Sequence, residues 1–152
     1  MTGPSFRFRL ERVRALRERK EKLAQQELAR SLSRLHSTRE QLRDAEHELE
    51  RARAEQRDTA SVPGTIAATE LQSRQAFLER VERQRSQREL EVSRGEAEVA
   101  SRGAELAVAA GEHEMLERLR TRRRTEHERD AARRESKVLD EMAASRTRRS
   151  VA

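Results

Sequence analysis

The fold is decided by the stretch "LARSLSRLHSTREQLRDAEHELE", residues 28–50. Four of its leucines recur every seven residues: Leu28, Leu35, Leu42 and Leu49. Leu32 occupies the complementary position of this repeat. A leucine every seven residues is the pattern of a coiled coil, in which a narrow apolar seam of one helix packs against another. The stretch therefore predicts a long helix that needs a helical partner.

The composition excludes a thick, layered core. Charged residues make up 41% of the 152 residues and hydrophobic residues only 34%, and the chain has no Trp, Tyr or Cys. Such a composition is also compatible with disorder. The heptad periodicity favours long helices instead, and the scarcity of Gly and Pro agrees with it. The absence of cysteine excludes disulfides and thiolate metal sites.

One break divides the chain into two helices. Pro63 and Gly64 in "SVPGT" are typical turn residues, and neither Pro nor Gly occurs between Ser5 and Ala60. The sequence predicts a single domain with a helix at about 6–60, a turn at 61–65 and a second helix at about 66–146. The second half carries its own heptad spacings, and these would let it fold back onto the first helix.

The predicted fold is all-α: a long two-helix antiparallel coiled-coil hairpin with a projecting C-terminal helical extension. Reversal at Pro63 sets an expected register, with these opposed groups: Leu49 with Phe77 and Leu78, Leu35 with Leu90 and Val92, Leu28 with Val99, Leu10 with Met115 and Leu116, and Phe6 and Phe8 with Leu119. The extension is then expected from about residue 121. Stability there would come from Arg/Glu pairs along the helix, such as Glu126 with Arg129.

Some residues depart from the regular repeat. Leu16 and Leu23 are seven residues apart but out of phase with the later leucines, which predicts a slip of the seam near Ala24. The glycines at 95, 103 and 111 indicate either local bending or close approach of the helices. Val138, Leu139 and Met142 follow a stretch without large aliphatic residues, so we expect them to fold back near Phe6, to form an exposed patch, or to bind a partner.

Charge is distributed unevenly. The net charge is +6, and residues 7–22 hold eight basic and three acidic side chains, whereas residues 40–58 hold four basic and seven acidic ones. The open end of the hairpin is therefore positive and the arm near the turn mildly negative, which suits different partners at the two ends. No long apolar run or signal-peptide core is present, so a cytoplasmic location is expected.

The order of several segments resembles the flagellar FliJ family over essentially the whole length. They are "FRFRLERVRALRERKEKLAQQELA" (6–29), the Pro-Gly break, "AFLERVERQ" (76–84), "EHEMLERLRTRR" (112–123) and "ESKVLDEMAASR" (135–146). The resemblance implies a stalk-like coiled coil in flagellar type III protein export. It implies that the protein binds the hexameric export ATPase FliI and promotes its assembly and activity, links it to the export gate protein FlhA and escorts export chaperones, on the cytoplasmic face of the membrane at the flagellar base.

The same resemblance suggests two sets of contact residues. The set for the ATPase comprises Phe6, Phe8, Arg9, Leu10, Arg17, Arg134, Val138, Leu139, Asp140, Glu141 and Met142. The set for the export gate comprises Leu42, Leu49, Phe77 and Val81. Family members often carry aromatic residues on the arm that faces the gate, whereas Phe77 is the only aromatic residue of this chain there.

Other functions have less support. The four histidines lack metal-ligand spacing and no phosphate-binding loop is present, so neither an enzyme nor a bound cofactor or metal is expected. "RLRTRRRTEHERDAARR" (118–134) could contact phosphates, but its acidic residues and the lack of stacking aromatics argue against nucleic-acid binding. The equivalent stalk of a non-flagellar type III injectisome stays open as an alternative.

Overall fold

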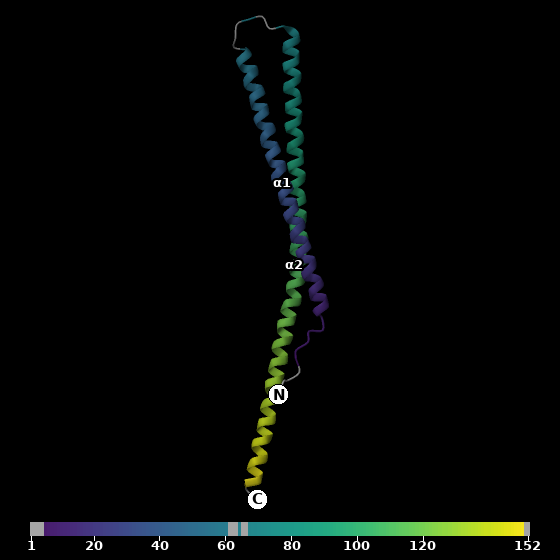
Figure 1. Cartoon of the computed structure of the whole chain (residues 1–152), viewed down its shortest axis with the longest axis vertical. Coiled ribbons are helices and arrows are strands. Elements are labelled where there is room, and N and C mark those ends of the chain that lie inside the picture. Colours follow the sequence, from purple (N-terminus) through teal and green to yellow (C-terminus); the bar gives the residue numbers. More distant parts are fainter. Residues whose placement is uncertain (1–4, 61–63, 65–66, 151–152) are drawn as a thin grey trace. The chain divides into compact units, whose positions relative to one another are not determined.

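The computed structural model describes residues 5–60, 64 and 67–150, and of residues 59, 60 and 147–150 the backbone alone. Two helices account for nearly all of them: α1, Glu11–Ala60, and α2, Ala68–Ser150. Figure 1 shows both, with α2 returning alongside α1. The all-α antiparallel hairpin predicted from the sequence is thus confirmed. Apart from Gly64, the predicted turn at 61–65 lies outside the described residues.

The contacts group the chain into two compact units. Unit 1 comprises 1–22 and 107–152, and unit 2 comprises 23–106. Each unit therefore contains part of both helices. The sequence suggests one continuous coiled coil. In the structure, different kinds of side chain pack α1 against α2 in the two units.

Unit 2 contains the apolar core. Its buried hydrophobic side chains are Leu35, Ala45, Leu49, Ala52 and Val81, and Val81 is only 2% exposed. On α1 the buried residues, together with half-buried Thr38 and Leu42, follow one another in steps of three and four, which is the spacing of a coiled-coil seam. The predicted leucine repeat is correct, but small residues rather than large ones fill the complementary positions. Leu32, predicted to lie in the seam, is exposed, and buried Ser31 takes that place.

The helices of unit 2 are paired further along α2 than predicted. Leu35 lies against Gly95 instead of Leu90, and Leu90 is exposed. Ion pairs at the edges of the seam agree: Arg34 with Glu98 at 2.6 Å, Arg39 with Glu96 at 2.7 Å and Arg53 with Glu82 at 3.0 Å. The predicted register is therefore wrong. It assumed reversal at Pro63 itself, whereas α2 begins only at Ala68.

Gly95 marks a close approach of the two helices. A Cβ atom on Gly95 would lie 3.1 Å from Cδ1 of the buried Leu35, which is tighter than ordinary van der Waals contact. A Cβ on Gly103 or Gly111 would meet nothing within 4 Å. Of the three glycines considered in the sequence, Gly95 is therefore the one that close packing explains.

In unit 1 the N-terminal segment is extended before it becomes helical. Helix α1 begins at Glu11, after a turn in which the Glu11 amide donates to the Phe8 carbonyl at 3.2 Å. The predicted start at residue 6 is therefore too early. Phe6 lies beside His127 of α2, which agrees with the observed register, in which Glu11 approaches Arg120.

The observed register also shortens the free part of α2. The extension was predicted from about residue 121, but the groove lined by the N-terminal segment includes α2 residues up to Asp130. From Ala132 to Arg146 every residue is exposed. Within unit 1, Figure 1 shows no other described helix beside this last part of α2.

The predicted seam slip near Ala24 does not occur. On α1, half-buried positions continue from Arg14 through Arg17, Glu21 and Ala24 to Leu28 in steps of three and four. Leu16 and Leu23 are exposed and lie outside this repeat. The heptad register is therefore kept, but charged side chains replace leucine in it at its N-terminal end.

Candidate partner-binding surfaces

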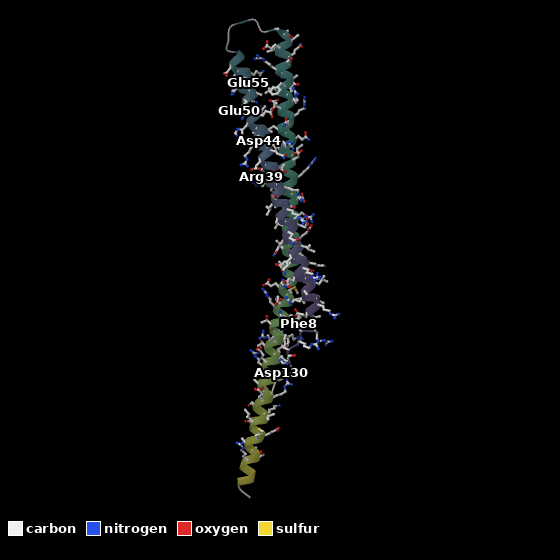
Figure 2. The ribbon with its side chains drawn as sticks, in the orientation of Figure 1. Phe8, Arg39, Asp44, Glu50, Glu55 and Asp130 are labelled. Atoms are coloured by element: carbon white, nitrogen blue, oxygen red, sulfur yellow. The ribbon has the colours of Figure 1, made fainter. Side chains whose placement is uncertain are left out.

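A groove beside the N-terminal segment gathers the first group of predicted contact residues. Its lining is contributed by both chain segments of unit 1: Ser5, Phe6, Arg7, Phe8, Arg9, Leu10, Leu119, Arg123, Glu126, His127 and Asp130. Phe6 and Phe8 are half-buried, and the ring centroids of Phe6 and His127 are 5.8 Å apart. Phe8 and Asp130 are labelled in Figure 2. The groove is lined by both apolar and charged side chains.

Next to this groove, the helices of unit 1 are joined by a charged network centred on Arg14. The Arg14 guanidinium donates to Glu11 at 2.7 Å and to Glu117 at 2.6 Å, and it lies 3.5 Å from Glu18. The hydrogen bond from Arg14 holds the pKa of Glu11 below its usual value. In turn, the hydrogen bonds that Arg14 donates to Glu11 and Glu117 raise the pKa of Arg14. The contact is therefore strongest with the carboxylates ionised.

Arg17 and His113 extend the network. Arg17, predicted to contact the ATPase, is half-buried and donates to Glu112 on α2. Nδ1 of His113 lies 2.7 Å from Glu21, while its buried Nε2 has no hydrogen-bond partner and lies 3.5 Å from Glu117. Arg17 therefore helps to hold α1 against α2, and a partner would reach only part of its side chain.

The C-terminal extension presents the second group of predicted contact residues. Val138, Leu139 and Met142 are 53%, 66% and 59% exposed. They do not fold back near Phe6, which was one of the alternatives left open by the sequence. Arg134 is also exposed, with its Nε donating to the Asp130 carbonyl at 3.1 Å, and Asp140 and Glu141 are exposed beside the apolar residues.

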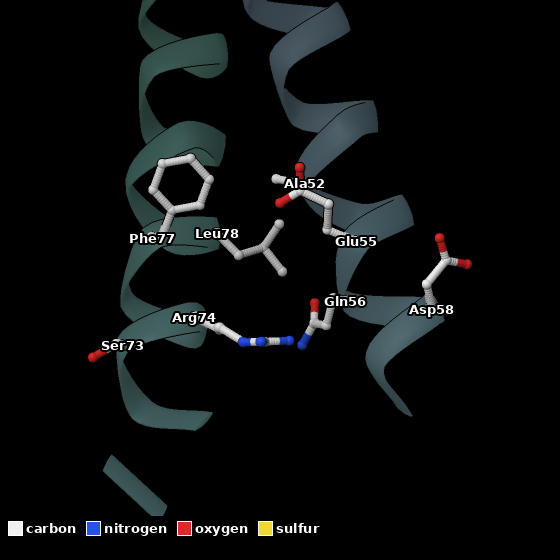
Figure 3. A pocket seen from close by; sticks show the side chains of 8 residues that line it. All are labelled: Ala52, Glu55, Gln56, Asp58, Ser73, Arg74, Phe77 and Leu78. Carbon is white, nitrogen blue, oxygen red and sulfur yellow. The ribbon is translucent and has the colours of Figure 1, made fainter. Parts of the chain in front are cut away.

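Near the turn, unit 2 presents a smaller surface. Figure 3 shows Leu78 pointing from α2 towards Ala52 of α1, with Arg74 and Gln56 below it. Phe77 is 40% exposed, and the Arg80 guanidinium carbon lies 5.6 Å from its ring centroid. Of the other predicted gate residues, Leu42 is half-buried and Leu49 and Val81 are buried. Phe77 is thus the residue of this group that a partner would reach.

The arginine-rich stretch of α2 is largely paired within the helix. Glu126 accepts from Arg122 at 3.1 Å and from Arg123 at 3.0 Å, and Glu128 accepts from Arg124 at 2.9 Å. Carboxylates bonded in this way lie where a phosphate backbone would have to bind. This arrangement favours a salt-bridged helix surface over a nucleic-acid site.

Several residues of these surfaces were not identified from the sequence. Leu119 was expected opposite the phenylalanines, but His127 and Arg123 of the groove were missed because the predicted register was wrong. The alternation Phe6, Phe8, Leu10 has a period of two, which is a signal of extended chain. Leu71, which is exposed near the turn, was not among the predicted contact residues.

No group of His, Cys, Asp and Glu side chains suited to a metal ion occurs in the described part of the chain. Within the same residues, no helix is long and apolar enough to span a membrane. Compared with known proteins, residues 6–152 match the family model described as "Flagellar FliJ protein". Neither a curated protein nor a solved structure matches the chain.

Proposed function

The chain belongs to the flagellar FliJ family, and we propose that within flagellar type III export it acts as a stalk-like protein of the export ATPase. In this proposal it binds the FliI hexamer, promotes its assembly and activity, and links it to the gate protein FlhA. It also escorts export chaperones, at the cytoplasmic face of the membrane at the flagellar base. The family match over nearly the whole chain supports the export role.

The exposed apolar cluster on the C-terminal extension carries the ATPase contact. Val138, Leu139 and Met142 are each more than half exposed on a helix that lacks a neighbour in unit 1. Leaving three large apolar side chains in water is unfavourable, and burying them against a partner would recover that free energy. Asp140 and Glu141 offer polar contacts at the edge of the same cluster.

The N-terminal groove supplies the second part of the contact. Phe6 lies beside His127 of α2, and Phe8 is half-buried like Phe6, whereas Arg9 and Leu10 are exposed. Arg9 and Leu10 are therefore proposed to touch the ATPase directly, while the two phenylalanines hold the segment in place. Arg17 and Arg134 add positive charge.

For the export gate, we propose Phe77 as the direct contact. Leu49 and Val81 are buried in the seam and would act by holding Phe77 in position, with Leu42 beside them. An exposed aromatic ring next to a guanidinium is typical of residues that contribute strongly to interfaces. Exposed Leu71, one to two turns before Phe77, extends this surface.

The test of the ATPase contact is stimulation of FliI by a variant carrying Val138→Ser, Leu139→Ser and Met142→Ser. Because the three side chains are exposed, the variant should keep its helical circular dichroism. We expect its stimulation of ATP hydrolysis to fall at least tenfold. Leu90→Ser, which changes a similarly exposed leucine in unit 2, is the control and should stimulate normally. Unchanged stimulation by a folded triple variant would refute the proposed contact.

A further inference from the structure

Unit 1 carries a second apolar stripe that its own helices do not use. The contact between α1 and α2 in unit 1 involves Arg14, Arg17 and Glu21 on one helix and His113, Leu116 and Arg120 on the other, at the seam positions of the heptad. Val13 and Leu16 on α1 are 41% and 53% exposed, and Val108 and Met115 on α2 are 64% and 72% exposed. These four side chains lie outside the seam.

Their spacing is that of a second heptad seam. With Arg14 and His113 at position a of the heptad, Val13 falls at position g, and Leu16, Val108 and Met115 fall at position c. Positions c and g are four residues apart in the heptad. Because each residue turns the helix by about 100°, four residues complete slightly more than one turn, so c and g lie next to each other on the helix surface. A second apolar repeat at these positions prepares a helix to contact a further helix on that side.

The ion pairs show that both helices present this repeat on the same flank. Position e lies on one flank of the seam, where Glu11 approaches Arg120 at 3.8 Å and Glu117 accepts from Arg14. Position g lies on the opposite flank, where Glu112 accepts from Arg17. Val13 shares the g flank with Glu112, and the three c residues adjoin it. We call this surface, formed by Val13, Leu16, Val108 and Met115, the lateral face.

The charges at the edge of the lateral face are basic. Its exposed cations are Arg12, Arg19, Lys20, Arg118 and Arg122. Among the described residues, Arg12, Arg19 and Lys20 form no ion pair. The neighbouring carboxylates are already engaged, since Glu112 binds Arg17 and Glu114 accepts from Arg118 at 2.5 Å. The uncompensated charge around the apolar stripe is therefore positive.

We propose that the lateral face binds an amphipathic α-helix of another protein, whose apolar stripe is flanked by Asp or Glu. The heptad spacing selects a helix, because only side chains repeated at the same period can pack continuously along the stripe. The unpaired cations select acidic flanks, which would meet Arg12, Arg19 and Lys20. None of the four apolar residues belongs to the proposed ATPase or gate contacts, so this proposal stands independently of them.

A designed peptide can test the proposal. The probe is a labelled helix of about four heptads with Leu at positions a and d and Glu at positions e and g. Two matched peptides carry either Lys in place of Glu or Ser in place of Leu. Binding to the full chain is measured by fluorescence anisotropy at low and physiological salt. We expect the Leu/Glu peptide to bind at least tenfold more tightly than either control, and less tightly at higher salt.

Two variants locate the binding. Leu16→Ser with Met115→Ser should weaken binding of the Leu/Glu peptide at least tenfold, while Leu71→Ser with Leu90→Ser, exposed leucines of unit 2, should not change it. A variant with Arg19→Glu and Lys20→Glu should no longer bind the Glu-containing peptide more tightly than the Lys-containing peptide. All these side chains are exposed, and circular dichroism checks that each variant stays helical.

Three results would overturn the proposal. One is equal binding of the Glu and Lys peptides, and another is binding that the Leu16→Ser and Met115→Ser changes leave intact. The third is self-association, measured by sedimentation equilibrium, that is lost in the same double variant. It would identify a second copy of this chain, rather than an acidic helix, as the occupant of the lateral face.

Discussion

The seams of the two units differ in kind. In unit 2 the central positions of α1 are filled by Leu35, Ala45 and Leu49, all buried. In unit 1 the corresponding positions of the same helix hold Arg14, Arg17 and Glu21, all half-buried and ion-paired to α2. Apolar burial provides most of the free energy that holds helices together, whereas partly exposed ion pairs provide little. Unit 2 therefore contains the stable apolar seam, and unit 1 exposes the surfaces proposed to bind the ATPase.

The largest effect should come from removing a leucine of the unit 2 seam. Leu49→Ala deletes buried apolar volume and leaves a cavity, so the free energy of unfolding should fall by about 3 kcal/mol. Urea denaturation followed by circular dichroism measures this loss. Leu32→Ala is the matched control, because Leu32 is exposed and its loss should change stability by less than about 0.5 kcal/mol. Equal losses from the two variants would contradict the seam described for unit 2.

A smaller effect should distinguish two glycines of α2. Gly103→Ala should stabilise the helix by about 1 kcal/mol, because alanine has the higher helix propensity and its Cβ meets nothing within 4 Å. Gly95→Ala should gain less than this, since the new Cβ would press on Leu35. Thermal unfolding of both variants gives the difference. A larger gain at Gly95 than at Gly103 would show that the helices do not approach closely there.

Acid should loosen unit 1 before unit 2. Hydrogen bonds from Arg14 and Lys22 lower the pKa values of Glu11 and Glu18. Their ionised forms therefore stabilise the folded state fully above the ordinary glutamate pKa of about 4.3. This stabilisation is lost as the pH falls through the lower folded values. Amide hydrogen exchange at pH 7 and in a series of steps to pH 3 should show earlier loss of protection in 11–22 than in 35–52.

The smallest effect should come from replacing one member of the charged network. Arg14→Gln removes the ion pairs to Glu11, Glu18 and Glu117. Amide exchange in 11–22 should become faster, with no change in 35–52, because the unit 2 core does not depend on Arg14. Lys137→Gln serves as a control for the loss of one positive charge. Faster exchange throughout unit 2 would contradict the separation of the two units.

The sequence predicts the hairpin but not its details. Leucines at 28, 35, 42 and 49 identify the seam of α1 because a heptad of large apolar residues is rare outside coiled coils. The opposite helix could not be placed in register, since any shift by a heptad still aligns apolar residues and the turn had to be located from Pro63 alone. Short side chains such as Ser31 and Ala45 gave no hydrophobic signal, although they fill the complementary positions.

For the candidate surfaces, the sequence indicated which residues could take part, but not how they are arranged in the structure. For the apolar cluster at Val138, the sequence left open whether it folds back near Phe6 or stays exposed, and the structure shows it exposed. Arg17 was expected to face a partner, but it donates to Glu112 of α2. This contact joins residues far apart in the sequence, so it could not be predicted without the correct register of the two helices. Leu16 was interpreted as part of a displaced seam, because sequence spacing alone does not show which of two flanks a leucine occupies.

The division into an apolar scaffold and an ATPase-binding unit is tested most directly by hydrogen exchange of the chain in the presence of FliI. We expect added protection in unit 1, at residues 5–22 and 132–146, with residues 35–52 of unit 2 unchanged. Protection confined to unit 2, with 132–146 exchanging as fast as in the free chain, would contradict it.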